Sequence, residues 1–134
     1  MSNSYEALMA YQRETEALAQ VAGRLSWDQE TVMPRGAADQ RGDEMAAMQH
    51  VLHARRVAPE VGDWLEGIDE ESLDDVGRAQ ERHIRRSFER STKVPARLAA
   101  ALARTISRAQ MTWIEARKAG DVGAFLPVLT EVLA

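Results

Sequence analysis

Three histidines are the side chains best suited to metal binding or proton transfer in this sequence. His50 and His53 are three residues apart, which puts them on one face of an expected helix, and His83 lies further along the chain. A zinc site needs three or four protein ligands, and neither a His-Glu-x-x-His nor a Glu-x-x-His pattern occurs. We therefore expect His50 and His53 to be surface histidines near a helix C-terminus, where the positive form of imidazole is favoured.

Carboxylates gather at one place that could support acid–base chemistry. Asp39, Asp43 and Glu44 fall in the first turns of an expected helix. No neighbouring group is expected to pair with them and so separate their pKa values. Negative charge stabilises a helix N-terminus, which is the role we assign to them. The sequence also has no glycine-rich phosphate loop and no Gly-x-Ser-x-Gly nucleophile turn, so no catalytic residue is predicted.

The composition excludes several classes of protein. Without cysteine, the chain has neither disulfides nor thiolate metal ligands. No basic segment followed by an apolar stretch opens the chain, and no window is apolar enough to span a bilayer, so we expect a cytoplasmic protein without membrane contact. With 45% hydrophobic and 28% charged residues, the 134 residues are expected to fold as one globular domain.

Charge is distributed unevenly along the chain. Residues 60–75 hold eight acidic and no basic side chains, whereas residues 78–118 hold eleven basic and three acidic ones. A basic stretch can bind nucleic acid, but this one has no aromatic or glycine-rich surface between its two expected helices. We therefore predict that these basic residues face acidic residues or another part of a larger protein, and not nucleic acid.

Helix-forming residues dominate the chain, and no stretch shows the two-residue alternation of a strand. Proline and glycine divide it into six expected helices, at residues 4–27, 37–57, 59–66, 73–92, 95–119 and 122–134. The predicted fold class is all-α, a bundle of about five to six helices. Ser4 and Ser72 are expected to cap the first and fourth helices, Gly120 to end the fifth and Asp121 to cap the sixth.

Apolar residues three and four positions apart define the expected buried face of each long helix. They are Leu8, Tyr11, Thr15, Leu18, Ala22 and Leu25, then Met45, Met48 and Leu52, then Leu73, Val76, Ile84 and Phe88, and finally Leu98, Leu102, Ile106, Ala109 and Trp113. Trp27 and Trp64 are further expected anchors. We place Trp27 in an ordered connection that runs to Pro34, as a fixed corner packed in the core.

The last segment is too apolar for one buried face. Its apolar residues cover more than half of the helix surface; they are Phe125, Leu126, Val128, Leu129, Val132 and Leu133. A helix with two apolar sides needs partners on two sides. We therefore expect the natural chain to continue past Ala134, and the isolated chain to self-associate.

Two stretches resemble the Taq-type thermostable carboxypeptidases, the zinc metallopeptidases of family 32. Residues 25–38, followed by Arg41, are similar to the family's W-D-x-x-T-x-M-P segment; the matching residues are Trp27, Asp28, Thr31, Met33 and Pro34. Residues 93–129 are similar to its K-V-P-x-x-L … W-x-x-A-R … D-F-x-x-F-x-P-x-L stretch; the matching residues include Pro95, Trp113, Arg117, Phe125 and Pro127. Val122 stands where the family usually has Phe, but the order and spacing match from about Tyr5 to Leu133.

The resemblance implies that residues 1–134 are the amino-terminal part of a larger all-helical enzyme, forming the lid and one wall of a deep groove. The family removes C-terminal residues from short peptides, and its full-length members are often homodimers. Its zinc ligands, a His-Glu-x-x-His helix and a downstream Glu, lie far beyond residue 134. We therefore expect no catalytic residue, metal ligand or cofactor in this chain, and zinc or another divalent metal in the full-length family.

The resemblance also assigns expected roles to residues of this chain. The ten matching residues are expected to be structural parts of the groove wall. Arg85 and Arg86 are expected to add positive field to the groove, which would suit the C-terminal carboxylate of a peptide substrate. Reversing both charges in the full-length enzyme should then raise the Michaelis constant for small peptides.

Three functions follow from these patterns. The first is an amino-terminal lid region that is inactive alone and depends on the remainder of a carboxypeptidase. The second is a free-standing helical binding or oligomerisation module that dimerises through its last helix. The third is a nucleic-acid-binding domain that uses residues 78–118; the pI of about 5.4 counts against it.

Overall fold

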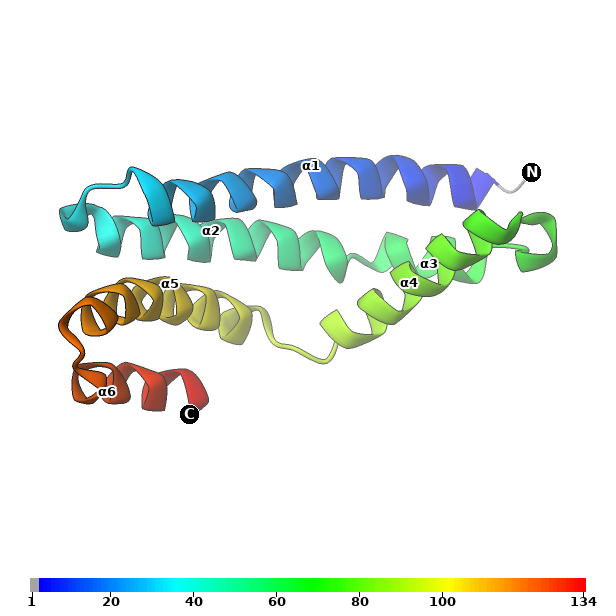
Figure 1. Ribbon diagram of the computed structural model, residues 1–134. Coiled ribbons are helices and arrows are strands. Elements are labelled where there is room, and N and C mark those ends of the chain that lie inside the picture. Colours follow the sequence, from blue (N-terminus) through cyan, green and yellow to red (C-terminus); the bar gives the residue numbers. More distant parts are fainter. Residues whose placement is uncertain (1–2) are drawn as a thin grey trace. The chain divides into compact units, whose positions relative to one another are not determined.

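A computed structural model describes residues 3–134, which form six α-helices and two short 3-10 turns without a β-strand (Figure 1). The helices are α1 (Asn3–Thr31), α2 (Ala38–Arg56), α3 (Pro59–Glu66), α4 (Asp75–Ser91), α5 (Ala96–Ala119) and α6 (Val122–Leu133), and the 3-10 turns are η1 (Arg35–Ala37) and η2 (Glu70–Ser72). The all-α class and the number of helices predicted from the sequence are confirmed. No helix in residues 3–134 is long and apolar enough to cross a membrane.

The first helix is longer than its predicted range. It continues through Trp27 to Thr31, so the expected connection beginning at Trp27 is wrong. No proline or glycine interrupts this segment, and the backbone N–H groups of Val32 and Met33 both donate to the carbonyl of Asp28, at 3.1 and 2.9 Å. The chain leaves the helix only where Pro34 removes a donor and restricts the residue before it.

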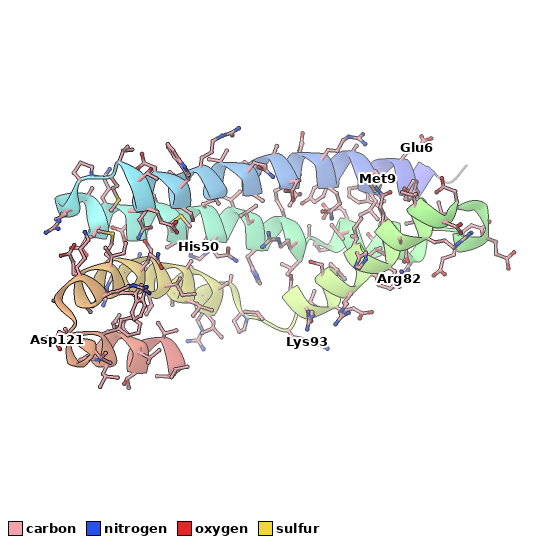
Figure 2. All side chains as sticks on the ribbon, viewed as in Figure 1. Glu6, Met9, His50, Arg82, Lys93 and Asp121 are labelled. Carbon is pink, nitrogen blue, oxygen red and sulfur yellow. The ribbon has the colours of Figure 1, made fainter. Side chains whose placement is uncertain are left out.

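The cap of α4 also differs from the prediction. Ser72 belongs to η2, and Asp74 caps the helix instead, because its Oδ1 accepts a hydrogen bond of 2.7 Å from the backbone N–H of Gly77. Between α5 and α6 the predictions hold. Gly120 has a left-handed φ of 68°, and Asp121 Oδ1 accepts from the N–H of Ala124 at 3.2 Å. Figure 2 shows Asp121 at this turn.

The helices divide into two compact units, each described here by itself. The first unit comprises the chain up to Gln20 together with Val51–Pro95, and the second comprises Val21–His50 together with Ala96–Ala134. Because α1 and α2 are continuous across these limits, each of these two helices contributes one end to each unit.

The core of the first unit forms where α1 meets α3 and α4. Leu8, Val61 and Leu65 are almost fully buried at its centre. Partly buried hydrophobic residues surround them, and they include Tyr11, Trp64, Ile84 and Phe88. The Trp64 ring packs edge-on against the Tyr11 ring with the ring centroids 5.4 Å apart, which is within the usual range for such pairs. Trp64 is therefore an anchor, as predicted.

The buried face of α4 differs from the apolar stripe read from the sequence. Val76 is exposed, whereas Glu81 and Gly77 are buried. Gly77 is buried because Tyr5 approaches it closely: an added Cβ would lie 3.3 Å from the Tyr5 hydroxyl, which donates a 2.6 Å hydrogen bond to Gln80 Oε1. Packing at this place requires a small residue and paired polar groups. The helical spacing of apolar residues in the sequence could not predict either of them.

In the second unit, α6 runs back along α5 in the opposite direction (Figure 1). The expected core stripe of α5 is mostly on the outside, since Leu98, Leu102 and Ile106 are 55%, 42% and 50% exposed. The buried residues of α5 are small; they are Ala99, Ala100, Ser107, Ala109 and Ala116. Small residues let helices approach closely, so α5 turns its alanines inward and leaves its large side chains on the surface. No residue of α6 is buried.

Candidate functional site

The first motif cluster is built around one buried arginine. Arg41, only 9% exposed, bonds through its guanidinium to the carboxylate of Asp28 at 2.6 Å and to that of Glu44 at 2.8 Å. Its third bond, of 2.5 Å, reaches the backbone carbonyl of Leu25. The hydrogen bond to Asp28 raises the pKa of Arg41 above the usual arginine value, although burial acts in the opposite direction. A permanent cation therefore ties the end of α1 to the beginning of α2.

The other residues of this motif shape the end of α1. The Thr31 hydroxyl donates to the carbonyl of Trp27 at 2.7 Å, and Pro34 takes an extended conformation that starts η1. Met33 is half-buried. Trp27, however, is 63% exposed, so its predicted place in the core is wrong. An indole on the outside of a helix leaves a large apolar surface free to contact another body.

The acidic residues at the start of α2 have partners that the sequence did not reveal. Asp43 forms an ion pair of 3.0 Å with Arg104 on α5, and Glu44 binds Arg41 at 2.8 Å. The expectation that nothing pairs with them is therefore wrong for these two. Asp39 is exposed in the first turn, where a carboxylate suits the helix N-terminus. These carboxylates connect helices and do not form an acid–base pair.

The second motif cluster lies where α5 turns into α6. The Trp113 and Phe125 rings pack edge-on with centroids 5.2 Å apart, and the Arg117 guanidinium carbon lies 5.8 Å from the centroid of the Trp113 ring. An ion pair of 3.1 Å between Arg108 and Glu131 joins the same two helices further on. These contacts fix the α5–α6 hairpin.

The two prolines of the second motif differ in their effect on backbone hydrogen bonding. Pro95 directly precedes α5, where a missing N–H costs nothing because the first turn has no partner for it. Pro127 lies inside α6, where it removes one intrahelical donor. Both side chains are exposed.

A buried polar pair that the sequence analysis missed joins α1 to α5. Gln29 Nε2 donates to the backbone carbonyl of Ser107 at 2.7 Å, and the Ser107 hydroxyl donates to Gln29 Oε1 at 3.0 Å. Both residues are buried. Gln29 lies inside the first motif, between Asp28 and Thr31. Its four-residue spacing from Leu25, which belongs to the predicted apolar face of the first helix, was the available signal.

The histidines do not form a metal site. His50 and His83 are exposed, but His53 is buried, so the prediction of two surface histidines on α2 is wrong for His53. The burial of Leu52 beside it shows that the inward face of α2 includes its last turns. Across residues 3–134, no group of three or more His, Asp or Glu side chains could hold a metal ion. The donor set of these described residues does not fit a catalytic zinc ion.

The two arginines expected to supply positive field differ in their surroundings. Arg85 donates to the buried carboxylate of Glu81 at 2.6 Å and to the carbonyl of Leu65 at 2.9 Å. Its charge is therefore largely balanced within α4. Arg86, next to it, is exposed.

Comparison with known proteins finds relatives over nearly the whole chain. A family model described as carboxypeptidase Taq (M32) metallopeptidase matches residues 7–134. Thermostable carboxypeptidase 1 of Thermus thermophilus is 37% identical over 136 residues, which cover 98% of this chain and 26% of that protein. A solved structure described as "The Structure of CHT" superposes with a TM-score of 0.68 at 29% identity, over 96% of this chain and 26% of the other. The chain therefore spans about a quarter of the length of these two relatives.

Proposed function

Since this chain belongs to the carboxypeptidase Taq (M32) family of metallopeptidases, we propose that it is the amino-terminal helical segment of a metallocarboxypeptidase and is not catalytic by itself. Two findings support the proposal. The Thermus relative is about four times as long as the matched region, and the donor set of residues 3–134 does not fit a metal ion. The metal, zinc or another divalent ion, would be held by residues outside this chain.

The observation that carries this proposal is the exposed apolar face of the second unit. Leu98, Leu102 and Ile106 follow one another at four-residue steps, so they lie within about 80° of one another around α5. On α6 the exposed large side chains are Val122, Leu126 and Leu133. Fully burying an exposed leucine or isoleucine side chain would stabilise the protein by about 1.5–3 kcal/mol. Such a face is typical of a surface that another body covers.

The remainder of the carboxypeptidase is the partner that we propose for this face. In that arrangement residues 1–134 form the lid and one wall of a groove, and the ten motif residues shape the wall. Peptides that enter the groove lose their C-terminal residue in the part of the enzyme that binds the metal. Arg86, which is exposed, is better suited than the paired Arg85 to attract the carboxylate of such a peptide. The cytoplasmic location and homodimeric state predicted from the sequence stay predictions.

A second candidate function uses the same surface differently. A free-standing module would cover its apolar α5–α6 face with a second copy of itself and would need no catalytic part. This candidate predicts a defined dimer of the 134-residue chain, with the face buried. The favoured proposal predicts only loose, concentration-dependent association, because the face is shaped for a different partner.

Assays on two polypeptides test the proposal. We expect the purified 134-residue chain to retain no stoichiometric metal and to cleave no short peptide, and a longer polypeptide that continues into the rest of an M32 sequence to do both. Charge reversal at Arg86 in the longer polypeptide should raise the Michaelis constant for short peptides, with charge reversal of the paired Arg85 as the comparison. Metal retention or peptide cleavage by the 134 residues alone would contradict the proposal.

A further inference from the structure

A cavity of about 240 Å³, partly open to solvent, is lined by α1, the end of α2, α3 and α4 in the first unit. All of its lining residues belong to the first unit, whereas the two motif clusters belong to the second. The volume equals that of about eight water molecules. It is slightly below the range of about 300–1,000 Å³ that is usual for drug-sized ligands. A molecule with about eight to ten non-hydrogen atoms matches this space.

One side of the cavity is a rigid apolar floor. Val61, Ile84 and Phe88 line it, and Val61 is 1% exposed at the centre of the core. Phe88 is held in place by close packing, since an added Cβ at Gly62 would lie 3.2 Å from its ring. Because these side chains are part of the folded core, the floor is formed before any ligand arrives. It would accept an aliphatic group of a few carbon atoms.

The other side of the cavity carries groups of both charges. Arg56 and Glu16 line it together with the imidazole of His83. Among the described residues of this unit, the ion pairs engage Arg55, Arg78 and Arg85, and none of them uses Arg56. Glu16 accepts a hydrogen bond from Gln20 through Oε1, at 2.9 Å, which leaves its Oε2 for another donor.

Thr15 limits what the polar side can recognise. Its hydroxyl already donates to the carbonyl of Tyr11 at 3.0 Å and accepts from Arg55 Nε at 2.9 Å. It therefore has no proton to offer a ligand. The cation of Arg56, the anion of Glu16 and the imidazole of His83 remain on this side, together with the neutral side chains of Gln12 and Ser87.

We propose that this cavity binds a free amino acid with an aliphatic side chain, as the zwitterion. The ligand carboxylate bonds to Arg56 and His83, the ammonium group to Glu16, and the side chain lies on the floor of Val61, Ile84 and Phe88. Leucine, with nine non-hydrogen atoms, matches the volume. A carboxypeptidase releases molecules of this class, so the cavity would sense product; that link rests on the proposed function, whereas binding itself does not.

Titration of the 134-residue chain with L-leucine, followed by the NMR signals of its three histidines, tests the proposal. We expect saturable shifts of the His83 imidazole and none at His50, which lies in the other unit and is labelled in Figure 2. Leucinamide lacks the carboxylate and N-acetyl-leucine lacks the ammonium group, so each should bind at least about fivefold more weakly than leucine, because each loses one charge-assisted hydrogen bond.

Paired variants locate the two charges. Arg56→Gln and Glu16→Gln should each weaken leucine binding at least about fivefold, while Arg56→Lys keeps most of it. Arg13→Gln and Glu60→Gln change exposed residues of the same unit that do not line the cavity, and should bind leucine like the unaltered chain. Circular dichroism confirms that each variant is folded.

Three results would overturn the proposal: no saturable shift at His83, equal affinity for leucine and both blocked analogues, or unchanged affinity in both Arg56→Gln and Glu16→Gln. None of these results depends on peptide cleavage. Peptidase assays of the longer polypeptide judge the proposed function separately, so either idea can fail while the other stands.

Discussion

Replacing Arg41 by alanine removes three hydrogen bonds at once from the junction of α1 and α2. The guanidinium side chain is 10% exposed, whereas its partners Asp28 and Glu44 are 36% and 38% exposed. A surface ion pair contributes about 0–1 kcal/mol, and breaking a buried one costs about 3–5 kcal/mol. The exposure of the two carboxylates places Arg41 between these limits, at about 2–3 kcal/mol, because water can solvate the carboxylates once the arginine is gone.

Urea denaturation followed by circular dichroism measures this change in the free energy of unfolding. In a thermal melt of a chain of this length, a loss of about 2.5 kcal/mol lowers the melting temperature by about 10 °C. Arg104→Ala is the matched control, since its 3.0 Å pair with Asp43 joins side chains that are 51% and 70% exposed and should contribute below about 0.5 kcal/mol. Equal effects of Arg41→Ala and Arg104→Ala would refute the reasoning.

The pKa of Arg41 gives the same experiment a pH dependence with a definite sign. A cation whose pKa is raised on folding stabilises the protein fully below its unfolded pKa, and this contribution is lost only as pH rises through the higher folded value. Both values lie far above neutral pH. The cost of Arg41→Ala should therefore be the same at pH 7 and pH 9, and a decrease of more than about 1 kcal/mol over that interval would contradict the assignment.

Four further substitutions, two of them combined in one double-mutant cycle, test the packing within each unit. Gln29→Ala and Ser107→Ala should be coupled by about 1 kcal/mol in a double-mutant cycle, because the Ser107 hydroxyl donates directly to Gln29 Oε1; additive effects would exclude that side-chain contact. Glu81→Ala should cost about 2 kcal/mol in urea denaturation, since it leaves the Arg85 guanidinium without its carboxylate partner, and a cost under 0.5 kcal/mol would contradict the buried ion pair. Leu8→Ala should cost about 3 kcal/mol, because a fully buried side chain leaves a cavity, and a melting temperature within 2 °C of the unaltered chain would contradict its place in the core.

The sequence predicted the helices well because helix-forming residues and chain breakers act locally. Pro59–Glu66 was predicted to the residue, and Gly120 and Asp121 were assigned their observed roles. The error at Trp27 has a local cause as well: Pro34 and Gly36 mark where a helix must have ended, but they do not say how closely the helix approaches them.

The buried faces were predicted less well, because burial depends on partners that the sequence of one helix does not name. On α5 the large residues Leu98, Leu102 and Ile106 have the helical spacing of a buried face, yet they are exposed. The buried face of α5 consists of small residues, mainly alanines. The spacing correctly identified an apolar face, but that face is exposed within residues 3–134. Glu81 and His53 are buried although their residue types are typical of surfaces.

The family motifs carried information that residue chemistry alone did not. From its residue type alone, Asp28 would be interpreted as an ordinary surface carboxylate. In the structure it accepts a hydrogen bond from Arg41, which lies thirteen residues further along the chain. Trp113, Arg117 and Phe125 similarly form one contact cluster across the α5–α6 turn. In both places side chains of the motifs connect neighbouring helices. The roles predicted for the ten motif residues in a groove wall stay predictions.

The most direct test of the proposed role is to ask whether the rest of an M32 chain covers the apolar face of α5. The sequence contains no cysteine, so Leu102→Cys introduces a single thiol in these 134 residues, and Ala101→Cys provides an exposed neighbour for comparison. Alkylation rates can be read by peptide mass spectrometry in the 134-residue chain and in the longer polypeptide. We predict that the longer polypeptide protects position 102 at least about tenfold relative to the 134-residue chain; equally fast alkylation of position 102 in both polypeptides would contradict the proposal.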